Sequence, residues 1–397
     1  MNRPLLLLGV AGFVSGTTIR LAEPLLPRVA EDFDVGVGRA SVLIWGFAIA
    51  YGLFQLVHGP LGDRIGKLRA ITIGTFAAGL ACAVCATATS LPALAAFRFL
   101  SGVTAGAVIP LSLAYVGDTV AFGERQAALA RYLIGTLSGQ VAGPLVGGIL
   151  GDAVGWRVTF LVPGVAFVLI GVLLTPTARR SPRPSRDGVP LNPLPGYARL
   201  VRHRHVRVVL GATALEGALF MGIYGYLGAF LRHEYALSYT AIGLVLASFG
   251  CGGIAYAAVA KPLIRRLGQP GLVLGGGAVV AGGLLVVALA PSWIACVPAL
   301  ALVGVGFFML HTTLQTRATE MAPETRGAAV AAFAASIFFG QTVGVGIIAA
   351  LLDGVGYRPL IAVSAGGLLV LATWFRLRLP ELERARLGGQ ASAHAER

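Results

Sequence analysis

The stretch Gly59-Pro60-Leu61-Gly62-Asp63-Arg64-Ile65-Gly66-Lys67 places three glycines and three charged side chains between two long apolar runs. A related stretch, Lys261-Pro262-Leu263-Ile264-Arg265-Arg266-Leu267-Gly268, follows 202 positions later. A second motif repeats at a spacing of 201, because Asp152, Gly155, Trp156 and Arg157 are followed by Asp353, Gly356, Tyr357 and Arg358. Repetition at half the chain length predicts two similar halves.

The composition places most of the chain in lipid. Hydrophobic residues make up 56% and charged residues 12%, with a mean hydropathy of +0.80, whereas about a quarter of the residues in soluble proteins are charged. A helix needs about 20 apolar residues to cross a bilayer. Such runs lie at 5–27, 38–58, 70–89, 93–117, 128–150, 158–176, 207–231, 239–260, 270–291, 293–316, 327–350 and 358–379. These runs are too long for barrel strands, so backbone groups must pair within helices.

The sequence therefore predicts an all-α membrane protein with twelve transmembrane helices in two pseudo-symmetric six-helix bundles. We expect an N-terminal bundle at residues 1–176, a basic central loop at 177–206, a C-terminal bundle at 207–380 and a tail at 381–397. The central loop is rich in arginine and proline around Arg179–Arg186, which opposes compact folding. The tail is short and polar, so we expect it to fray.

The net charge of +14 follows membrane topology. If the N-terminus is cytoplasmic, most of the 31 basic residues lie on that side, and the outer loops hold only Arg28, Arg39, Arg157, Arg232 and Arg358. The positive-inside rule then places both termini in the cytoplasm of a multi-pass protein of the bacterial inner membrane. The same distribution argues against a nucleic-acid partner. We expect the first run to remain as a helix, since it lacks the cleavage site of a signal peptide.

These motifs carry a family resemblance. The stretch from Gly59 to Lys67 resembles the signature loop after the second helix of the major facilitator superfamily, and the repeat extends the likeness over the whole chain. On the fifth span, Gly139-Gln140-Val141-Ala142-Gly143-Pro144-Leu145-Val146-Gly147-Gly148 resembles the signature of the twelve-helix drug:proton antiporters, which implies export. Arg98 with Gly102 and Gly106 resembles a looser antiporter signature.

The resemblance implies a conformational latch at the cytoplasmic mouth, in which Asp63 and Lys67 join Asp118 and Arg125 to hold the outward-facing state. Its residues are Gly59, Asp63, Arg64, Gly66, Lys67, Asp118 and Arg125. The family has two adjacent basic residues at the end of the loop, whereas here Leu68 follows Lys67. The alternative is ordinary turn chemistry with topology charges. Since Arg265 stands where Asp63 does, the latch should be asymmetric.

The glycines of the fifth span, Gly139, Gly143, Gly147 and Gly148, recur at helical spacing, which predicts a flat packing face kinked by Pro144. In the antiporters that it resembles, this helix seals the cytoplasmic side of the substrate path. The alternative is a plain helix-packing seam.

Four ionisable residues lie deep in apolar spans: Arg20, Glu23, Arg98 and Glu216. A charge at a helix centre costs ~2.5 to 3.5 kcal/mol on insertion scales, so such residues face a cavity or a partner. Arg20 and Glu23 share a helix face, where they are expected to pair, and Arg98 lies at a similar depth. We expect these three to meet in the N-terminal bundle, beside the bend that Pro24 and Pro27 predict.

Glu23 is the first candidate for a proton carrier, and its alternative role is a structural ion pair with Arg20. Glu216 has no basic neighbour on its own helix, so we expect an unpaired, protonated carboxyl suited to a proton or a cation. Gln55, His58, Tyr224, Tyr226 and His311 are candidate lining residues, and ordinary hydrogen bonds between helices are equally compatible with them.

The chain has no phosphate-binding loop, nucleophile elbow or metal-ligand cluster, so we expect no enzyme, cofactor or metal site. The sequence therefore predicts proton-coupled efflux of a small, amphipathic or drug-like molecule by a monomer that works by alternating access, with protons and the lipid bilayer as its partners. The alternatives are an importer or facilitator of a small polar solute, and a membrane sensor. The buried residues include two glutamates and two arginines, so they do not predict whether the substrate is cationic, neutral or anionic.

Overall fold

The chain is described by a computed structural model that covers residues 3–181, 194–322 and 325–395. Within these residues every regular element is a helix. The first half contains α1 (Arg3–Arg20), α2 (Leu26–Asp32), α3 (Val37–Ala40), α4 (Val42–Ile65), α5 (Lys67–Cys85), α6 (Leu91–Ala105), α7 (Val108–Thr119), α8 (Phe122–Ala153) and α9 (Gly155–Arg180). The second half contains α10 (Leu194–Arg202), α11 (Arg204–Glu216), the π-helix η1 (Gly217–Met221), α12 (Gly222–Tyr235), α13 (Tyr239–Leu289), α14 (Trp293–Glu320), α15 (Arg326–Val355) and α16 (Tyr357–Ala395).

The helices account for the expected spans. Among the described residues, ten helical stretches are long and apolar enough to cross a membrane. One of them, α13, contains two spans joined at Gly268, and the shorter apolar helix α1 supplies a further crossing. The prediction of an all-α membrane protein is confirmed, and the helices are consistent with twelve spans.

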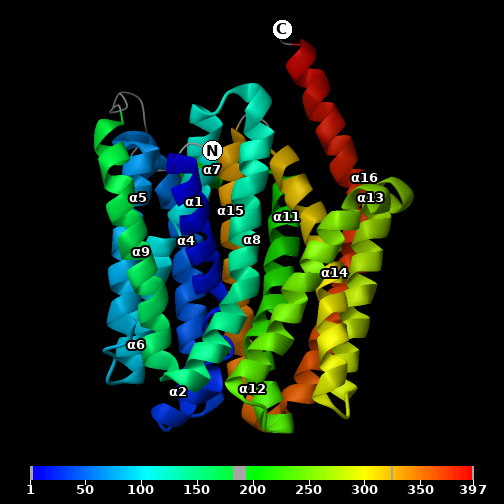
Figure 1. The fold of residues 1–397 in the computed structure, drawn as a ribbon. Coiled ribbons are helices and arrows are strands. Elements are labelled where there is room, and N and C mark those ends of the chain that lie inside the picture. Colours follow the sequence, from blue (N-terminus) through cyan, green and yellow to red (C-terminus); the bar gives the residue numbers. More distant parts are fainter. Residues whose placement is uncertain (1–2, 182–193, 323–324, 396–397) are drawn as a thin grey trace.

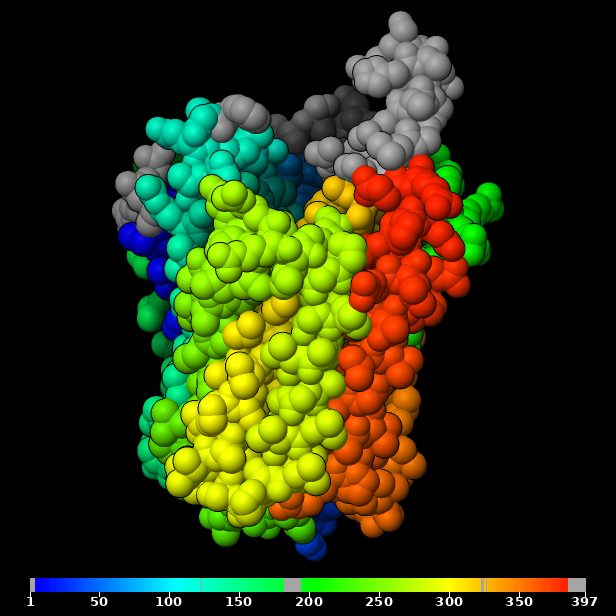
Figure 2. Space-filling model, turned by 90° about the vertical axis from the view of Figure 1, so that its right-hand side faces the viewer, coloured from blue at the N-terminus to red at the C-terminus, as the bar shows by residue number. Residues whose placement is uncertain are grey.

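The two halves stand side by side, with both chain ends at the same end of the bundle (Figure 1). We call this end the termini face, and the end where α2 and α12 lie the opposite face. Figure 2 shows one flank of the second half, where α13, α14 and α16 lie against each other.

Glycines at equivalent positions of the repeat make the same turns. Gly66 and Gly268 have φ of 92° and 60°, and Gly155 and Gly356 have φ of 80° and 81°. Residues with a Cβ rarely adopt this left-handed region. The repeat seen in the sequence is thus a repeat of backbone geometry.

The signature stretch is mostly helix rather than loop, which corrects the prediction. α4 continues through Pro60 to Ile65, and the turn is made by Gly66 alone. No heavy atom lies within 4 Å of a Cβ built on Gly59, whereas one on Gly62 would lie 2.5 Å from Leu111. Gly62, rather than Gly59, therefore allows a close helix approach in this stretch.

The central loop and the tail are more helical than expected. α9 continues to Arg180, and the part of the arginine-rich run after Ser181 lies outside the described residues. α10 then packs through Leu200, which is buried, while Tyr197 donates a hydrogen bond to the carbonyl of Leu56 at 3.4 Å. α16 is helical through Ala395, where the sequence predicts fraying.

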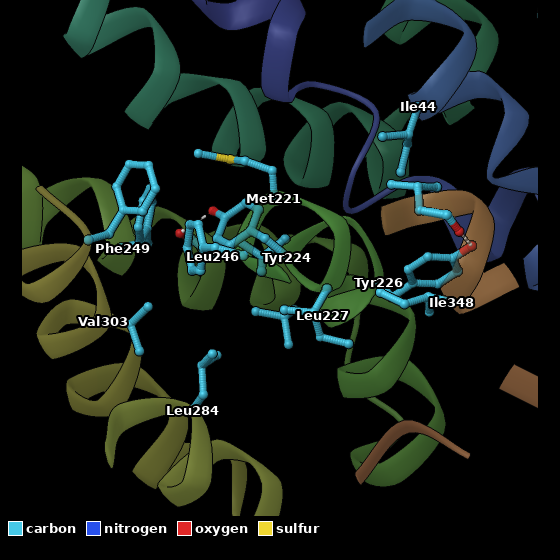
Figure 3. Close-up of a cluster of buried hydrophobic side chains, with 14 of the residues drawn as sticks. Ile44, Met221, Tyr224, Tyr226, Leu227, Leu246, Phe249, Leu284, Val303 and Ile348 are labelled. Atoms are coloured by element: carbon cyan, nitrogen blue, oxygen red, sulfur yellow. Dashed lines mark hydrogen bonds between the residues drawn. The ribbon is translucent and has the colours of Figure 1, made fainter. Parts of the chain in front are cut away.

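The halves pack against each other toward the opposite face. Near the start of α13, a side chain at Gly243 would collide with the carbonyl of Pro144 on α8. Near the start of α4, Thr342 of α15 donates to the carbonyl of Trp45 at 3.4 Å. Figure 3 shows part of the resulting core, in which Ile44 of the first half approaches Tyr226 and Ile348 of the second.

Candidate functional site

The first span is broken beside a buried carboxylate. α1 ends at Arg20, residues 21–25 form a turn that includes Pro24, and α2 begins at Leu26 with Pro27 in its first turn. This confirms the predicted bend, because proline is tolerated in turns and in the first turn of a helix but breaks a helix interior. Glu23 therefore lies at a helix break.

Arg20 and Glu23 form a buried ion pair, as their spacing predicts. Nη1 of Arg20 donates to Oε1 of Glu23 at 2.7 Å, and the two side chains are 7% and 1% exposed. The second oxygen of Glu23, Oε2, is buried and accepts no hydrogen bond from the described part of the chain. The carboxyl group thus retains one acceptor that a proton or a ligand can use.

The same arginine crosses to the second half. Its Nη2 donates to Sδ of Met221 in η1 at 2.7 Å, and its Cζ lies 5.0 Å from the ring centroid of Tyr224 on α12. Tyr224 itself donates to the carbonyl of Leu246 on α13 at 2.9 Å. The Arg20–Glu23 pair therefore sits at the interface between the two halves.

Glu216 has a partner that the sequence did not reveal. Its Oε2 lies 2.8 Å from Nδ1 of His311 on α14, and the side chains are 0% and 16% exposed. The expectation of an unpaired Glu216 is therefore wrong, because the partner comes from 95 positions along the chain rather than from the same helix. Oε1 of Glu216 is buried and without a hydrogen bond in the described residues.

A π-helical segment connects the two buried pairs. η1 starts at Gly217, directly after Glu216, and ends at Met221, which contacts Arg20. Such segments are rare and often occur at functional sites. The π-helix was not predicted from the sequence, where its only visible sign is a pair of glycines, Gly217 and Gly222, flanking an apolar tripeptide and Met221.

A chain of aromatic rings also links the pairs. The ring centroids of Tyr224 and Phe220 are 5.6 Å apart, those of Phe220 and Phe307 4.7 Å, and those of Phe307 and His311 5.0 Å. Phe249 packs beside them, 5.1 Å from Phe220. Sequence analysis selected Tyr224 and His311 but missed the phenylalanines between them, since apolar runs contain many such residues.

Arg98 does not join the first pair, which corrects the expected three-residue cluster. It is 1% exposed, its Nε donates to the carbonyl of Leu43 at 3.2 Å, and its guanidinium lies 4.2 Å from the ring centroid of Phe47 and 5.2 Å from that of Phe160. These aromatic faces hold it inside the first half. Its Nη1 has no hydrogen bond in the described residues.

The candidate lining residues have different surroundings. Gln55 and His58 on α4 are each 8% exposed. Figure 3 shows Tyr224 and Tyr226 pointing in opposite directions from α12, and Tyr226 donates to the carbonyl of Val345 at 3.0 Å. Tyr226 therefore makes an ordinary hydrogen bond between helices.

The charge cluster near the termini face forms in part. Lys67 contacts the carboxylate of Asp118, and its Nζ lies 3.4 Å from Oδ1 of Asp63. Arg125 donates to the carbonyl of Val120 at 3.4 Å. Because Asp63 and Asp118 are both about half exposed, these pairs are individually weak. All these contacts join elements of the first half.

The glycine motif on α8 has two contact faces. Gly139, Gly143 and Gly147 pack on α1, and a Cβ at Gly143 would lie 2.8 Å from Cβ of Arg20. Pro144 and Gly148 instead meet α13, where the carbonyl of Tyr239 leaves no room for a side chain at Gly148. The motif lies in the later part of α8, so it closes the opposite face rather than the termini face. The predicted seal of the cytoplasmic side stays a prediction.

No group of three or more metal-ligating side chains occurs in the part of the chain that the structure describes. The chemistry at the centre consists of two buried carboxyl groups, each with one basic partner and one free oxygen, at or near an interface between two helix bundles. Buried charges at an interface between helix bundles are typical of membrane transporters.

Comparison with known proteins identifies the family. The model of the Major Facilitator Superfamily matches residues 8–334, and the chain belongs to that family. The "Uncharacterized MFS-type transporter YceJ" of Bacillus subtilis (strain 168) is 27% identical over 357 residues, which cover 87% of this chain and 88% of that protein. The "Chloramphenicol resistance protein" of Streptomyces lividans is 29% identical, with 80% and 81% covered.

Two further comparisons bear on a part of the chain and on the fold. The "Multidrug export protein EmrB" of Escherichia coli (strain K12) is 27% identical over 166 residues, or 41% of this chain and 32% of that protein. A solved bacterial homolog of the human lysosomal transporter Spinster, in its inward-facing and occupied conformation, superposes with a TM-score of 0.74 at 16% identity. It covers 94% of this chain and 95% of that chain, which supports the fold alone.

Proposed function

We propose that this transporter exports a small, amphipathic, drug-like molecule from the bacterial cytoplasm in exchange for protons. It acts as a monomer in the inner membrane, with both termini cytoplasmic as the distribution of basic residues favours. Relatives named for chloramphenicol resistance and multidrug export support export over import. The observation that carries the proposal is the Arg20–Glu23 pair, buried where the two halves meet.

Glu23 is the exchange site in this proposal. Its free Oε2 takes a proton or accepts a hydrogen bond from substrate, but not both at once. Mutually exclusive binding at one carboxyl group makes proton release a consequence of substrate binding, which is the requirement for coupled exchange. Arg20 contacts Glu23 and also Met221 and Tyr224 of the second half, so a change in the charge of Glu23 alters the contacts between the halves.

Glu216 and His311 form the second proton site, since an imidazole and a carboxylate 2.8 Å apart can share and pass a proton. The aromatic chain between the two sites suits the planar, apolar part of a drug-like molecule, because aromatic rings stack with energies of ~0.5–1.5 kcal/mol beyond burial. With the termini cytoplasmic, contact between the halves at the opposite face makes this conformation inward-facing.

The experiment measures proton release from purified protein on addition of chloramphenicol, followed by a wider panel of toxic compounds in a pump-deficient host. We expect Glu23→Gln and Glu216→Gln each to reduce proton release, and Glu124→Gln, at an exposed position, to leave it unchanged. Unchanged release in both of the first two variants, for a compound that still binds, would contradict the proposal.

An importer or facilitator of a small polar solute is the second candidate. It is favoured by Arg98, whose buried Nη1 lacks a partner in the described residues and suits an anionic group. Transport into vesicles under pH gradients of either sign separates the two, because antiport moves substrate against the proton flow and symport moves it with the flow.

A further inference from the structure

The repeated outer motif that begins at Asp152 is not used by the proposed transport cycle. Asp152 lies in the last turn of α8, at the opposite face. Its Oδ1 accepts a hydrogen bond from the backbone N–H of Tyr239 at 3.1 Å, and its Oδ2 accepts one from the N–H of Thr240 at 2.7 Å. These amides begin α13, which belongs to the other half.

The contact satisfies groups that the helix cannot satisfy by itself. The first four N–H groups of an α-helix have no partner within the helix, and the helix dipole favours a negative charge at this end. Ser238 accepts from the N–H of Ala241 at 3.2 Å, so α13 supplies one acceptor for its own first turn. Asp152 supplies two more from across the interface.

The residues around Asp152 strengthen the same junction. The hydroxyl of Tyr239 donates to Oε2 of Glu31 on α2 at 3.3 Å, and Glu31 pairs with Arg28 at 3.7 Å. Arg232 of α12 lies over the ring of Tyr239, 5.2 Å from its centroid. One turn deeper, Gly148 lets the α8 backbone approach the Tyr239 carbonyl, which fixes Asp152 opposite the amides.

The second half provides a built-in comparison. Asp353 occupies the equivalent position, 201 residues later, near the end of α15, and the equivalent target is the start of α3 at Val37 and Gly38. The cap residue of α3, Gly36, carries no side-chain cap hydrogen bond, and within the described residues Asp353 makes no side-chain hydrogen bond. The backbones still approach there, since a Cβ at Gly38 would lie 2.8 Å from the carbonyl of Ala349.

We propose that Asp152 is a one-sided conformational latch, which holds the halves closed at the outer face by capping α13 across the interface. Opening the outer face separates α8 from α13, and both hydrogen bonds then break. The latch therefore favours the inward-facing state, and the equivalent junction between α15 and α3 has no such capping contact. This role does not depend on which substrate or ion the protein carries.

The test is the rate at which a membrane-impermeant maleimide labels a cysteine in the α8–α13 seam from the outer side. Ala247→Cys is a small-to-small reporter, because Ala247 shares a face of α13 with Gly243 and Gly250, which pack on α8, and is 5% exposed. The exposed native cysteine is removed by Cys251→Ser, and the other three cysteines are buried. Because the reagent reacts with the open state only, the labelling rate follows even a minor outer-open population.

We expect Asp152→Ala to raise the labelling rate about tenfold, since charge-assisted hydrogen bonds are about twice as strong as neutral ones. Asp152→Asn keeps one acceptor oxygen and should have an intermediate effect, whereas Asp353→Ala should leave the rate within about twofold of the parent. Gly148→Leu, which wedges the seam apart, confirms that the reporter detects opening. If Gly148→Leu raises the rate but Asp152→Ala behaves like Asp353→Ala, the latch is refuted.

Discussion

Replacing Arg20 by leucine tests whether the buried ion pair stabilises the interface. The change removes the 2.7 Å hydrogen bond to Glu23, the contact with Met221 and the cation–π contact with Tyr224. It also leaves the carboxyl group of Glu23, which is 1% exposed, without its only charged partner in the described residues. Removing one partner of a buried pair costs ~3–5 kcal/mol, mostly because the remaining charge is stranded.

A double-mutant cycle separates this penalty from lost packing. Glu23→Gln alone removes the negative charge, and Arg20→Leu combined with Glu23→Gln removes both charges. We expect the double variant to be more stable than Arg20→Leu alone by ~2–3 kcal/mol, because no charge is then stranded. The loss in Arg20→Leu should also shrink at acidic pH, where a proton neutralises Glu23.

The assay is thermal unfolding in detergent, followed with a thiol-reactive dye. Cys82, Cys85 and Cys296 are buried and become reactive when the bundle opens. Glu124→Gln, at an exposed carboxyl group, is the matched control for loss of a negative charge. If the destabilisations of Arg20→Leu and Glu23→Gln simply add in the double variant, the two side chains are not coupled and the ion pair has no energetic role.

Three further predictions concern other parts of the structure. Hydrogen bonds from Trp156 at 2.9 Å and Arg157 at 2.6 Å, in the first turn of α9, hold the pKa of Asp32 at the end of α2 below its usual range. The stability that ionised Asp32 contributes is present above its unfolded pKa and is lost as pH falls through its folded pKa. Asp32→Asn should therefore lower the melting temperature at about pH 7 and make little difference in strong acid. His311→Ala should lower the melting temperature because it strands Glu216, and adding Glu216→Gln should recover part of the loss, measured in the same dye assay. Phe220→Ala should cost ~3–5 kcal/mol because the ring is fully buried, and Phe220→Leu should cost less because it leaves a smaller cavity, measured in the same dye assay.

Local sequence patterns predicted the features that depend on near neighbours. The twelve apolar runs follow from helix length and bilayer thickness. The pairing of Arg20 with Glu23 follows from a three-residue spacing on one turn, although the helix ends at Arg20 and the pair spans a helix break. The turn at Gly66 follows from a glycine between two helices.

Features that depend on tertiary packing were not predictable in this way. His311 reaches Glu216 only because α14 packs beside α11, and no local pattern encodes that contact. The extension of α4 beyond Gly59 depends on the helix tolerating Pro60. The glycines of α8 serve two neighbours, α1 and α13, and a periodicity of four identifies only one of these faces.

The repeat also locates the candidate site within the bundle. The nearest equivalent turns, at Asp34 and Ala236 with φ of 49° and 50°, are 202 positions apart, so Arg20 is equivalent to Gly222. Arg20 touches Met221, the residue beside its own equivalent. A residue lies beside its own equivalent only near the pseudo-two-fold axis that relates the halves. Glu23 is likewise equivalent to Gly225, which follows Tyr224, whose ring lies beside Arg20. The first half thus places its ion pair near the axis, against uncharged equivalents from the second half.

This asymmetry has a mechanical consequence. Side chains near the axis stay close to both halves when the halves rock, so the Arg20–Glu23 pair can contact the second half in more than one conformation. Glu216 corresponds to Val14, which carries no charge, so the second half holds its own ionic pair at a position that the first half leaves neutral. The two halves therefore share a similar arrangement of helices, while their ionisable groups lie at different positions.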